Sequence, residues 1–336
     1  SDGLMFIPYS RIGGRDKGFQ GESYFTTKNP DVGAKISFYF KESVKSLKEQ
    51  REEEEKEKFK DKEPIEYPSY EELRAEEDEE ESFLILTILD QQDRVVRTMR
   101  TAAKKGLHRL NWDLRFPNIT SANLGNAAPM KDPESGILVL PGTYQVFLSK
   151  SLNGEVTRLT EPVSFEVKNL DNQTLPSGDR QALVEFQSRL SNLNQALNGS
   201  RRATSEIEEQ IRYFKAAVKV LNSPTEAVQA EIRDLEKKLD SVRRKLSGDR
   251  TLSRLDRDQP VSIASRISSA IYGGFRSTSD PTQTQRKVYS IVEEEFDPII
   301  EEINGMLTND IPAIQRQLDE AGAPWTPGRT IEWRKN

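Results

Sequence analysis

The chain has 336 residues, of which 35% are hydrophobic and 31% charged, and it carries a net charge of −6, one histidine and no cysteine. The lack of cysteine excludes disulfides, thiolate nucleophiles and thiolate metal sites. No apolar run approaches the roughly 18 to 20 residues that a membrane-spanning helix needs, and residues 1–10 lack a charged start followed by an apolar stretch, so the sequence predicts neither a membrane span nor a signal peptide.

Residues 1–33 are rich in glycine and carry scattered aromatic side chains. They lack the glycine spacing of a phosphate-binding loop, so we expect a lead-in segment from an upstream domain that lies on the surface and packs through its aromatics. The chain also opens without methionine, on the loop-like residues Ser1, Asp2 and Gly3, which indicates a mature product or a piece of a longer protein.

From 34 to 170 the apolar residues alternate with a period of two, which is typical of half-buried strands. Turn residues such as Pro141-Gly142 and Asn153-Gly154 separate these segments, and the run 83–89 is apolar on both faces, as in a central strand. The pattern predicts an antiparallel immunoglobulin-like β-sandwich. The alternating residues are Ile36, Phe38, Phe40, Leu110, Trp112, Leu114, Tyr144, Val146, Leu148, Val163, Phe165 and Val167.

A charged insertion, 42–82, interrupts this region. Residues 45–81 hold 17 acidic and 8 basic side chains, a balance of −9, which leaves +3 for the rest of the chain. We expect a helical or mobile insertion without chemistry. A cation site needs ligands from several directions around one point, and glutamates along one helix do not supply them, so no metal site is predicted.

Residues 176–322 carry apolar residues at alternating steps of three and four, which predicts an antiparallel α-helical bundle. Gly199 and Gly248 are predicted to end two of its helices, while Ser223 to Glu226 and Asp280-Pro281 mark helix starts. The last helix should kink or restart at Pro298 and Pro312. The extended tail 323–336 is expected to lie against the helical bundle or the β-sandwich through Trp325 and Trp333. The three longest seams are Leu183, Phe186, Leu190, Leu193, Leu197; Ile207, Ile211, Phe214, Val218, Leu221; and Val228, Ile232, Leu235, Leu239, Val242, Leu246.

No residue type or spacing marks a reaction centre. The single histidine, His108, lies at an alternating strand position and has no nucleophile elbow to partner it. The basic stretch 237–257 contains no aromatic residue, so it predicts a solvated helix face that pairs with the acids of 293–302, not a nucleic-acid interface. We therefore assign no catalytic, cofactor or metal residue.

Four segments of the strand region carry a family resemblance: 29–34, 88–98, 106–115 with its Trp-Asp-Leu-Arg run, and 140–146 with its Pro-Gly-Thr-Tyr run. Together they resemble the C-terminal region of bacterial sortilin-like proteins, which are large exported proteins with Asp-box (BNR-type) propeller repeats, often labelled glycosyl hydrolases. The resemblance covers nearly all of the chain and implies a hook-cap-type immunoglobulin-like domain followed by a helical tail. One departure is Asp93, where the family's hairpin turn commonly has glycine; aspartate tolerates left-handed backbone.

The motif residues are interpreted as structural. Trp112 should plug the core between sheets, Asp113 and Arg115 on the opposite face should bind each other or loop backbone, and the Tyr144 hydroxyl should return to nearby backbone after the Pro141-Gly142 turn.

The function expected from these features is a non-catalytic accessory and interaction region of an exported protein, periplasmic, secreted or on the cell surface. It would brace an upstream propeller of the same polypeptide and present a surface to a protein partner. One alternative is that the parent hydrolyses glycosides with propeller carboxylates and this region shapes one wall of its cleft. Another is a carbohydrate-binding module that uses Tyr67, Tyr70 or Trp325 as stacking platforms.

Overall fold

The computed structural model describes residues 2–5, 32–118, 132, 135–170, 175, 177–221, 226–275 and 278–331. They divide into two compact units, the first holding the described residues up to 184 and the second those from 185 onward. Most of the predicted lead-in segment, the predicted helix start at Ser223 and the tail residue Trp333 lie outside the described residues.

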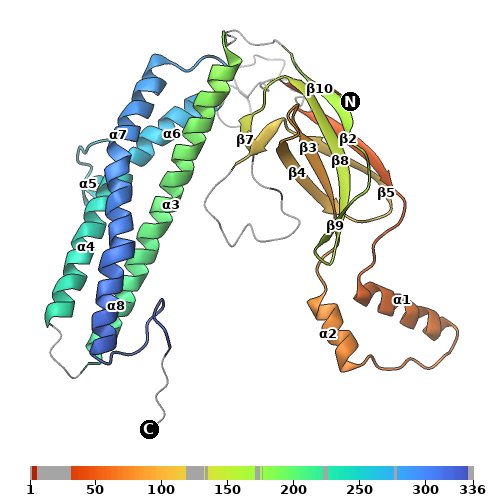
Figure 1. Cartoon of the computed structure of the whole chain (residues 1–336), viewed down its shortest axis with the longest axis horizontal. Coiled ribbons are helices and arrows are strands. Elements are labelled where there is room, and N and C mark those ends of the chain that lie inside the picture. Colours follow the sequence, from red (N-terminus) through yellow and green to blue (C-terminus); the bar gives the residue numbers. More distant parts are fainter. Residues whose placement is uncertain are drawn as a thin grey trace, which may run out of the picture. The chain divides into compact units, whose positions relative to one another are not determined.

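The main sheet of the first unit is mixed. Its strand order is β1-β10-β8-β3-β4, with β9 paired to β8. β1 runs parallel to β10, placing Gly3 opposite Val167, whereas the other pairs in this sheet are antiparallel. Figure 1 shows β3, β4, β8, β9 and β10 of this sheet. The strands are β1 (Gly3–Met5), β3 (Phe83–Leu89), β4 (Val95–Ala102), β8 (Gly142–Leu152), β9 (Glu155–Arg158) and β10 (Val163–Asn169).

The predicted fold class, an antiparallel immunoglobulin-like β-sandwich followed by an antiparallel α-helical bundle, is wrong. The chain has a mixed α/β fold with a curled, half-barrel mixed sheet. β2 (Ala34–Phe40) pairs with β5 (Gly106–Trp112), and β6 (Arg115–Pro117) pairs with β7 (Ser135–Leu138), in two separate small ladders. A period of two tells which face a side chain takes, but it does not tell which strand lies beside it or in which direction that strand runs.

Several local predictions for the sheet are confirmed. β3 lies between β8 and β4, as expected for the central strand. Asn153 and Gly154 both have left-handed backbone, with φ of 49° and 78°, which suits a two-residue hairpin turn. Asp93 also takes a left-handed φ of 56°, and the Asp90 carboxylate accepts backbone hydrogen bonds from Gln92 and Arg94 to close this turn.

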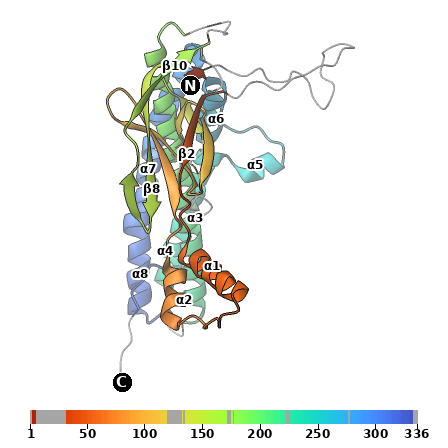
Figure 2. The ribbon, with the colours of Figure 1, turned by 90° about the vertical axis from the view of Figure 1, so that its right-hand side faces the viewer.

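The charged insertion folds as two helices, α1 (Leu47–Lys60) and α2 (Tyr70–Asp78), visible together in Figure 2. Each begins with a capping box, Ser46 with Glu49 and Ser69 with Glu72. In each box the serine hydroxyl accepts from the glutamate N–H while the glutamate carboxylate accepts from the serine N–H, so two otherwise unpaired donors are satisfied.

The second unit begins within α3 (Arg180–Lys219), a single continuous helix of 40 residues (Figure 1). The prediction that Gly199 ends a helix is therefore wrong. Glycine in a helix interior costs only about 1 kcal/mol, and the buried side chains of Leu197 and Ile207 on either side gain more than that by packing in one core.

The remaining helices are α4 (Glu226–Ser247), α5 (Arg250–Arg254), α6 (Ile263–Gly274), α7 (Gln283–Gly305), the π-helical segment η2 (Met306–Asp310) and α8 (Ile311–Glu320). Gly248, with φ of 89°, follows the end of α4 as predicted. Pro312 lies in the first turn of α8, whereas Pro298 lies inside α7 without ending it. The predicted start at Asp280-Pro281 is displaced, because Thr282 is the N-cap of α7 and forms a capping box with Gln285.

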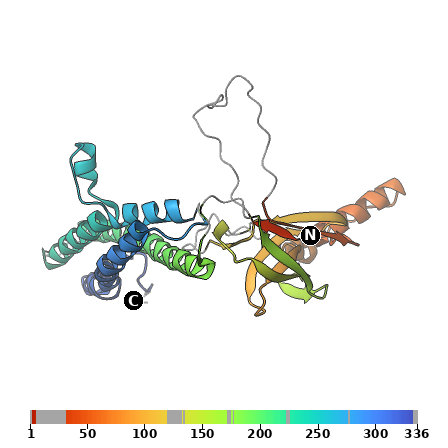
Figure 3. The same ribbon diagram turned by 90° about the horizontal axis from the view of Figure 1, so that it is seen from above.

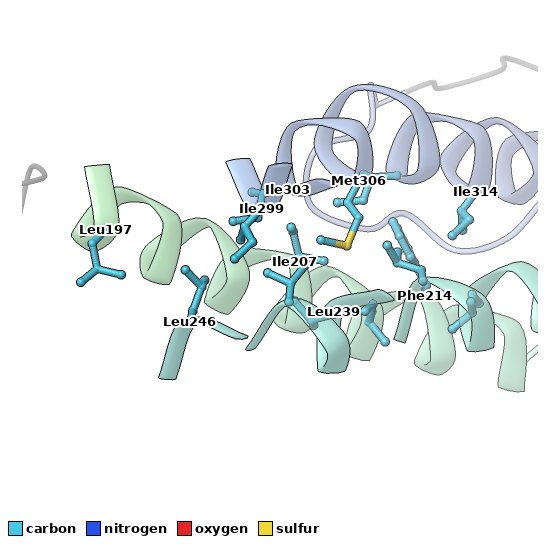
Figure 4. Packing of buried hydrophobic residues seen from close by; sticks show 14 of the residues in the cluster. Leu197, Ile207, Phe214, Leu239, Leu246, Ile299, Ile303, Met306 and Ile314 are labelled. Atoms are coloured by element: carbon cyan, nitrogen blue, oxygen red, sulfur yellow. The ribbon is translucent and has the colours of Figure 1, made fainter. Parts of the chain in front are cut away.

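The apolar seams of these helices meet in one hydrophobic core. Figure 4 shows Leu197, Ile207 and Phe214 of α3 near side chains from α4, α7 and α8. Every member of the α4 seam is buried, and full burial of one such aliphatic side chain is worth about 1.5–3 kcal/mol. Among the described helices, none combines the length and the apolar character required to cross a membrane.

Candidate functional site

The predicted motif residues of the first unit surround Trp112, which is fully buried at the end of β5. Its ring packs edge-on against Tyr144, at 5.3 Å between centroids, and against Phe165, at 6.1 Å. Its indole N–H donates to the Arg115 carbonyl at 3.1 Å. Trp112 therefore anchors the hydrophobic core of this unit.

The chain bends directly after Trp112. The sequence pattern predicted one strand carrying Leu110, Trp112 and Leu114 on the same face, but β5 ends at Trp112 and Leu114 has a left-handed φ of 60°. Such a backbone costs roughly 1–2 kcal/mol for a residue with a β-carbon. Leu114 is completely buried, and its carbonyl accepts from the Val139 N–H at 2.9 Å, so packing and this hydrogen bond hold the bend.

Asp113 and Arg115 stabilise the same bend. Asp113 accepts from the Arg115 backbone N–H at 3.2 Å and from the Ser135 hydroxyl. The Arg115 guanidinium donates to the Gly136 carbonyl at 2.8 Å, and burial lowers the pKa of Arg115 although the nearby Asp113 opposes that shift. Both side chains thus bind backbone groups or the neighbouring strand.

Tyr144 secures the turn that contains Pro141 and Gly142. Its hydroxyl donates to the Leu140 carbonyl at 2.6 Å, which confirms the predicted return to backbone. Burial raises the pKa of Tyr144 to about 12, and the negative charge of Asp90 adds to the shift. The motif residues are brought together by the fold, and every contact described for them is structural.

His108 is also held in a structural setting. Its ring stacks on Phe38 with the two planes 8° apart, and its Nε2 lies 2.6 Å from the Lys104 carbonyl, to which it donates.

In the second unit, the predicted pairing of basic and acidic helix faces is confirmed for Lys245, which contacts Glu302 at 2.8 Å.

The exposed surface of the hairpin formed by α1 and α2, with the connecting residues 61–69, is the strongest candidate site in the first unit. Neither helix has a buried residue. Three aromatic side chains of this hairpin face solvent: Phe59 is 74% exposed, Tyr67 89% and Tyr70 76%. Large exposed aromatics on a highly charged element are typical of contact surfaces rather than of a core.

Ion pairs give this hairpin a defined shape. Arg51 of α1 donates two hydrogen bonds to Glu76 of α2, at 2.5 and 3.0 Å, and a third to Glu55 at 2.7 Å. The Leu47 N–H at the start of α1 donates to the Glu79 carboxylate at 2.7 Å. The hydrogen bonds from Arg51 lower the pKa of Glu76, which favours the ionised carboxylate.

A groove of about 410 Å³ lies between α1 and α2. Its lining includes five carboxylates against two basic side chains, Arg51 and Lys58. Ile65, Tyr67 and Pro68 of the connecting residues add an apolar rim. The carboxylates are those of Glu54, Glu55, Glu66, Glu72 and Glu76.

This arrangement suits a ligand that carries positive charge beside an apolar or aromatic group. Composition indicated the acidity of the insertion, and Pro64, Pro68 and the Ser69 capping box mark a break between two helices, but no residue type in the sequence indicates that α2 folds back beside α1. Within the ranges that the structure describes, no group of three or more histidine or carboxylate side chains is placed to hold a metal ion.

Comparison of the sequence with known protein families and with curated proteins finds no match.

Proposed function

We propose that this chain is a non-catalytic accessory region that binds a basic protein surface through the α1–α2 hairpin. The observation that carries the proposal is the acidic groove between the two helices, with Tyr67 almost fully exposed at its rim. The partner supplies lysine or arginine side chains to the groove and an apolar patch to the aromatic residues.

Electrostatics and anchoring contribute differently to this binding. The balance of −9 over residues 45–81 attracts a basic partner over about one Debye length, roughly 8 Å at physiological ionic strength. Charge of this kind raises the association rate and orients the partner. The aromatic side chains supply the buried area that slows dissociation, and an arginine stacked on Tyr67 adds about 0.5–1 kcal/mol.

A direct test uses the full chain and a fluorescein-labelled peptide rich in arginine and lysine, followed by fluorescence anisotropy. We expect Tyr67→Ser to weaken binding at least about tenfold, or 1.4 kcal/mol. The matched control is Tyr213→Ser, which removes a 40% exposed tyrosine from α3 and should leave binding unchanged. If Tyr67→Ser binds as tightly as the unaltered chain, the anchoring role is refuted, and if the peptide does not bind at all, the proposal fails.

The same proposal places this accessory region in a larger exported, sortilin-like propeller protein that it braces. Its support is the resemblance of residues 106–115 and 140–146, whose side chains form the bend after Trp112 and the turn before Tyr144. Asp-box repeats in the polypeptide upstream of Ser1 are the expected finding, and a different upstream domain would refute the parentage. The alternative function, a larger protein that hydrolyses glycosides, predicts that replacement of its propeller carboxylates abolishes glycoside hydrolysis.

Carbohydrate binding is a second candidate because Tyr67 and Tyr70 are free to stack on a sugar face. Trp325 is less suited to this role, since its indole N–H already donates to the Arg329 carbonyl at 2.9 Å. A glycan array probed with the full chain and with Tyr67→Ser separates the two functions. Glycan binding that depends on Tyr67, without peptide binding, would replace the first proposal.

A further inference from the structure

The second unit contains a pocket of about 520 Å³ where α4 ends, α6 begins and α7 carries Pro298. Ile263 and Ile299 line this pocket and are also members of the hydrophobic core, so its floor is apolar. Leu252 and Val261 contribute further apolar surface from the segment 248–262, which contains α5. A volume of this size is in the range of small-molecule sites, which lie at roughly 300–1,000 Å³.

The wall of the pocket formed by residues 248–262 is built by specific hydrogen bonds. Gln259 accepts from the Asp249 N–H and donates to the Ser253 hydroxyl, both at 2.7 Å. Asp249 in turn caps α5 by accepting from the N–H groups of Thr251 and Leu252, which lowers its pKa and keeps it ionised. Within this segment, α5 lies apart from the packed helices, as Figures 2 and 3 show.

A second hollow of about 410 Å³ adjoins the first, and the two share Arg244, Gly248 and Asp249 in their linings. Together the linings hold six basic and three acidic side chains, a balance of +3. The basic residues are Arg201, Arg243, Arg244, Lys245, Arg250 and Arg266, and the acidic ones are Asp240, Asp249 and Glu295.

These cations differ in how closely they are paired. Arg243, Arg244 and Lys245 form close ion pairs with Glu208, Asp240 and Glu302, respectively. Arg266 donates from its Nε to the Val261 carbonyl at 3.2 Å, and its ion pair is longer: the Glu295 carboxylate oxygen lies 4.0 Å from its Nη2. That distance is too long for a hydrogen bond.

The Arg266 side chain is only 26% exposed, so most of its surface is already removed from water. A guanidinium in this state is well suited to bind a carboxylate through two parallel hydrogen bonds. Its position beside an apolar floor places a charge-specific contact next to a hydrophobic one, which is the usual composition of a small-molecule site.

We propose that this pocket binds an amphipathic organic carboxylate, such as an acid with an aliphatic chain. The apolar body lies over Ile263 and Ile299, and the carboxylate binds the guanidinium of Arg266. Arg201 and Arg250 of the adjoining hollow raise the local positive potential and favour the anion over a neutral analogue. Glu295 opposes binding, because its charge lies close to the same guanidinium.

Isothermal titration calorimetry of the full chain with decanoate tests this site, with decan-1-ol as the uncharged analogue. We expect decanoate to bind and the alcohol to bind at least tenfold more weakly. Arg266→Gln should weaken decanoate binding at least tenfold, whereas Arg266→Lys should retain part of it. Glu295→Gln should strengthen binding, since it removes a competing negative charge.

Arg233→Gln is the matched control, because Arg233 lies in the same helix as Arg244 but eleven positions away, about 16 Å along the axis. This variant should bind decanoate as the unaltered chain does. Circular dichroism of each variant shows whether the helices are intact. Absence of decanoate binding overturns the proposal, and so does equal binding by the correctly folded Arg266→Gln variant. Neither result bears on the hairpin, whose peptide binding is measured separately.

Discussion

Replacement of Gly199 by alanine is expected to stabilise the second unit. Gly199 lies in the interior of α3 with no left-handed φ, and a β-carbon built on it would meet no atom within 4 Å. The change therefore adds no clash and removes the unfavourable helix propensity of glycine, which is worth about 0.8–1.0 kcal/mol. For a unit of this size, 1 kcal/mol corresponds to a rise in unfolding midpoint of about 2–4 °C.

Gly248→Ala is the matched control for this prediction. Gly248 follows α4 with a left-handed φ of 89°, and its added β-carbon would lie 3.2 Å from the Gln259 Oε1. This variant should lose about 1 kcal/mol or more of unfolding free energy. Thermal unfolding followed by far-ultraviolet circular dichroism compares both variants with the unaltered chain. A lower midpoint for Gly199→Ala would show that α3 is interrupted at this glycine and would refute the continuous helix.

Three further predictions concern single side chains. Arg51→Ala should speed amide exchange in α1 and α2 without altering exchange in β3, because it removes the hydrogen bonds to Glu76. Tyr144→Phe should lower the unfolding free energy by about 1 kcal/mol in denaturant titration. Since the folded pKa of Tyr144 is about 12 against an ordinary value of 10.0, the unaltered chain should lose stability between pH 10 and 12. The phenylalanine variant should lose less over the same range, and what loss remains comes from groups such as Tyr289, whose pKa burial also raises. Leu239→Ala should cost about 2–5 kcal/mol, measured by urea unfolding, and no change would contradict its burial in the core.

The sequence alone showed, for many residues, whether the side chain lies on the buried or the exposed face of its helix or strand. The steps of three and four in α4 identified all of its buried residues, because a helix of 3.6 residues per turn places them on one side. Alternation likewise identified Tyr144, Val146 and Leu148 as buried in β8. The turns at Asn153-Gly154 and at Asp93 could also be predicted from their residue types, because few residues adopt a left-handed backbone at low cost.

The partners of these elements were decided by tertiary structure. Nothing in the three residues of β1 indicates that they pair in parallel with β10, more than 150 positions along the chain. Gly199 has a low helix propensity, but it lies inside α3 because the packing of the long apolar seam of this helix outweighs the cost of one glycine. Leu114 adopts a left-handed backbone that leucine normally avoids, because its complete burial holds it there. The hairpin groove and the pocket beside Arg266 depend on contacts between distant segments, and only the folded chain brings those segments together.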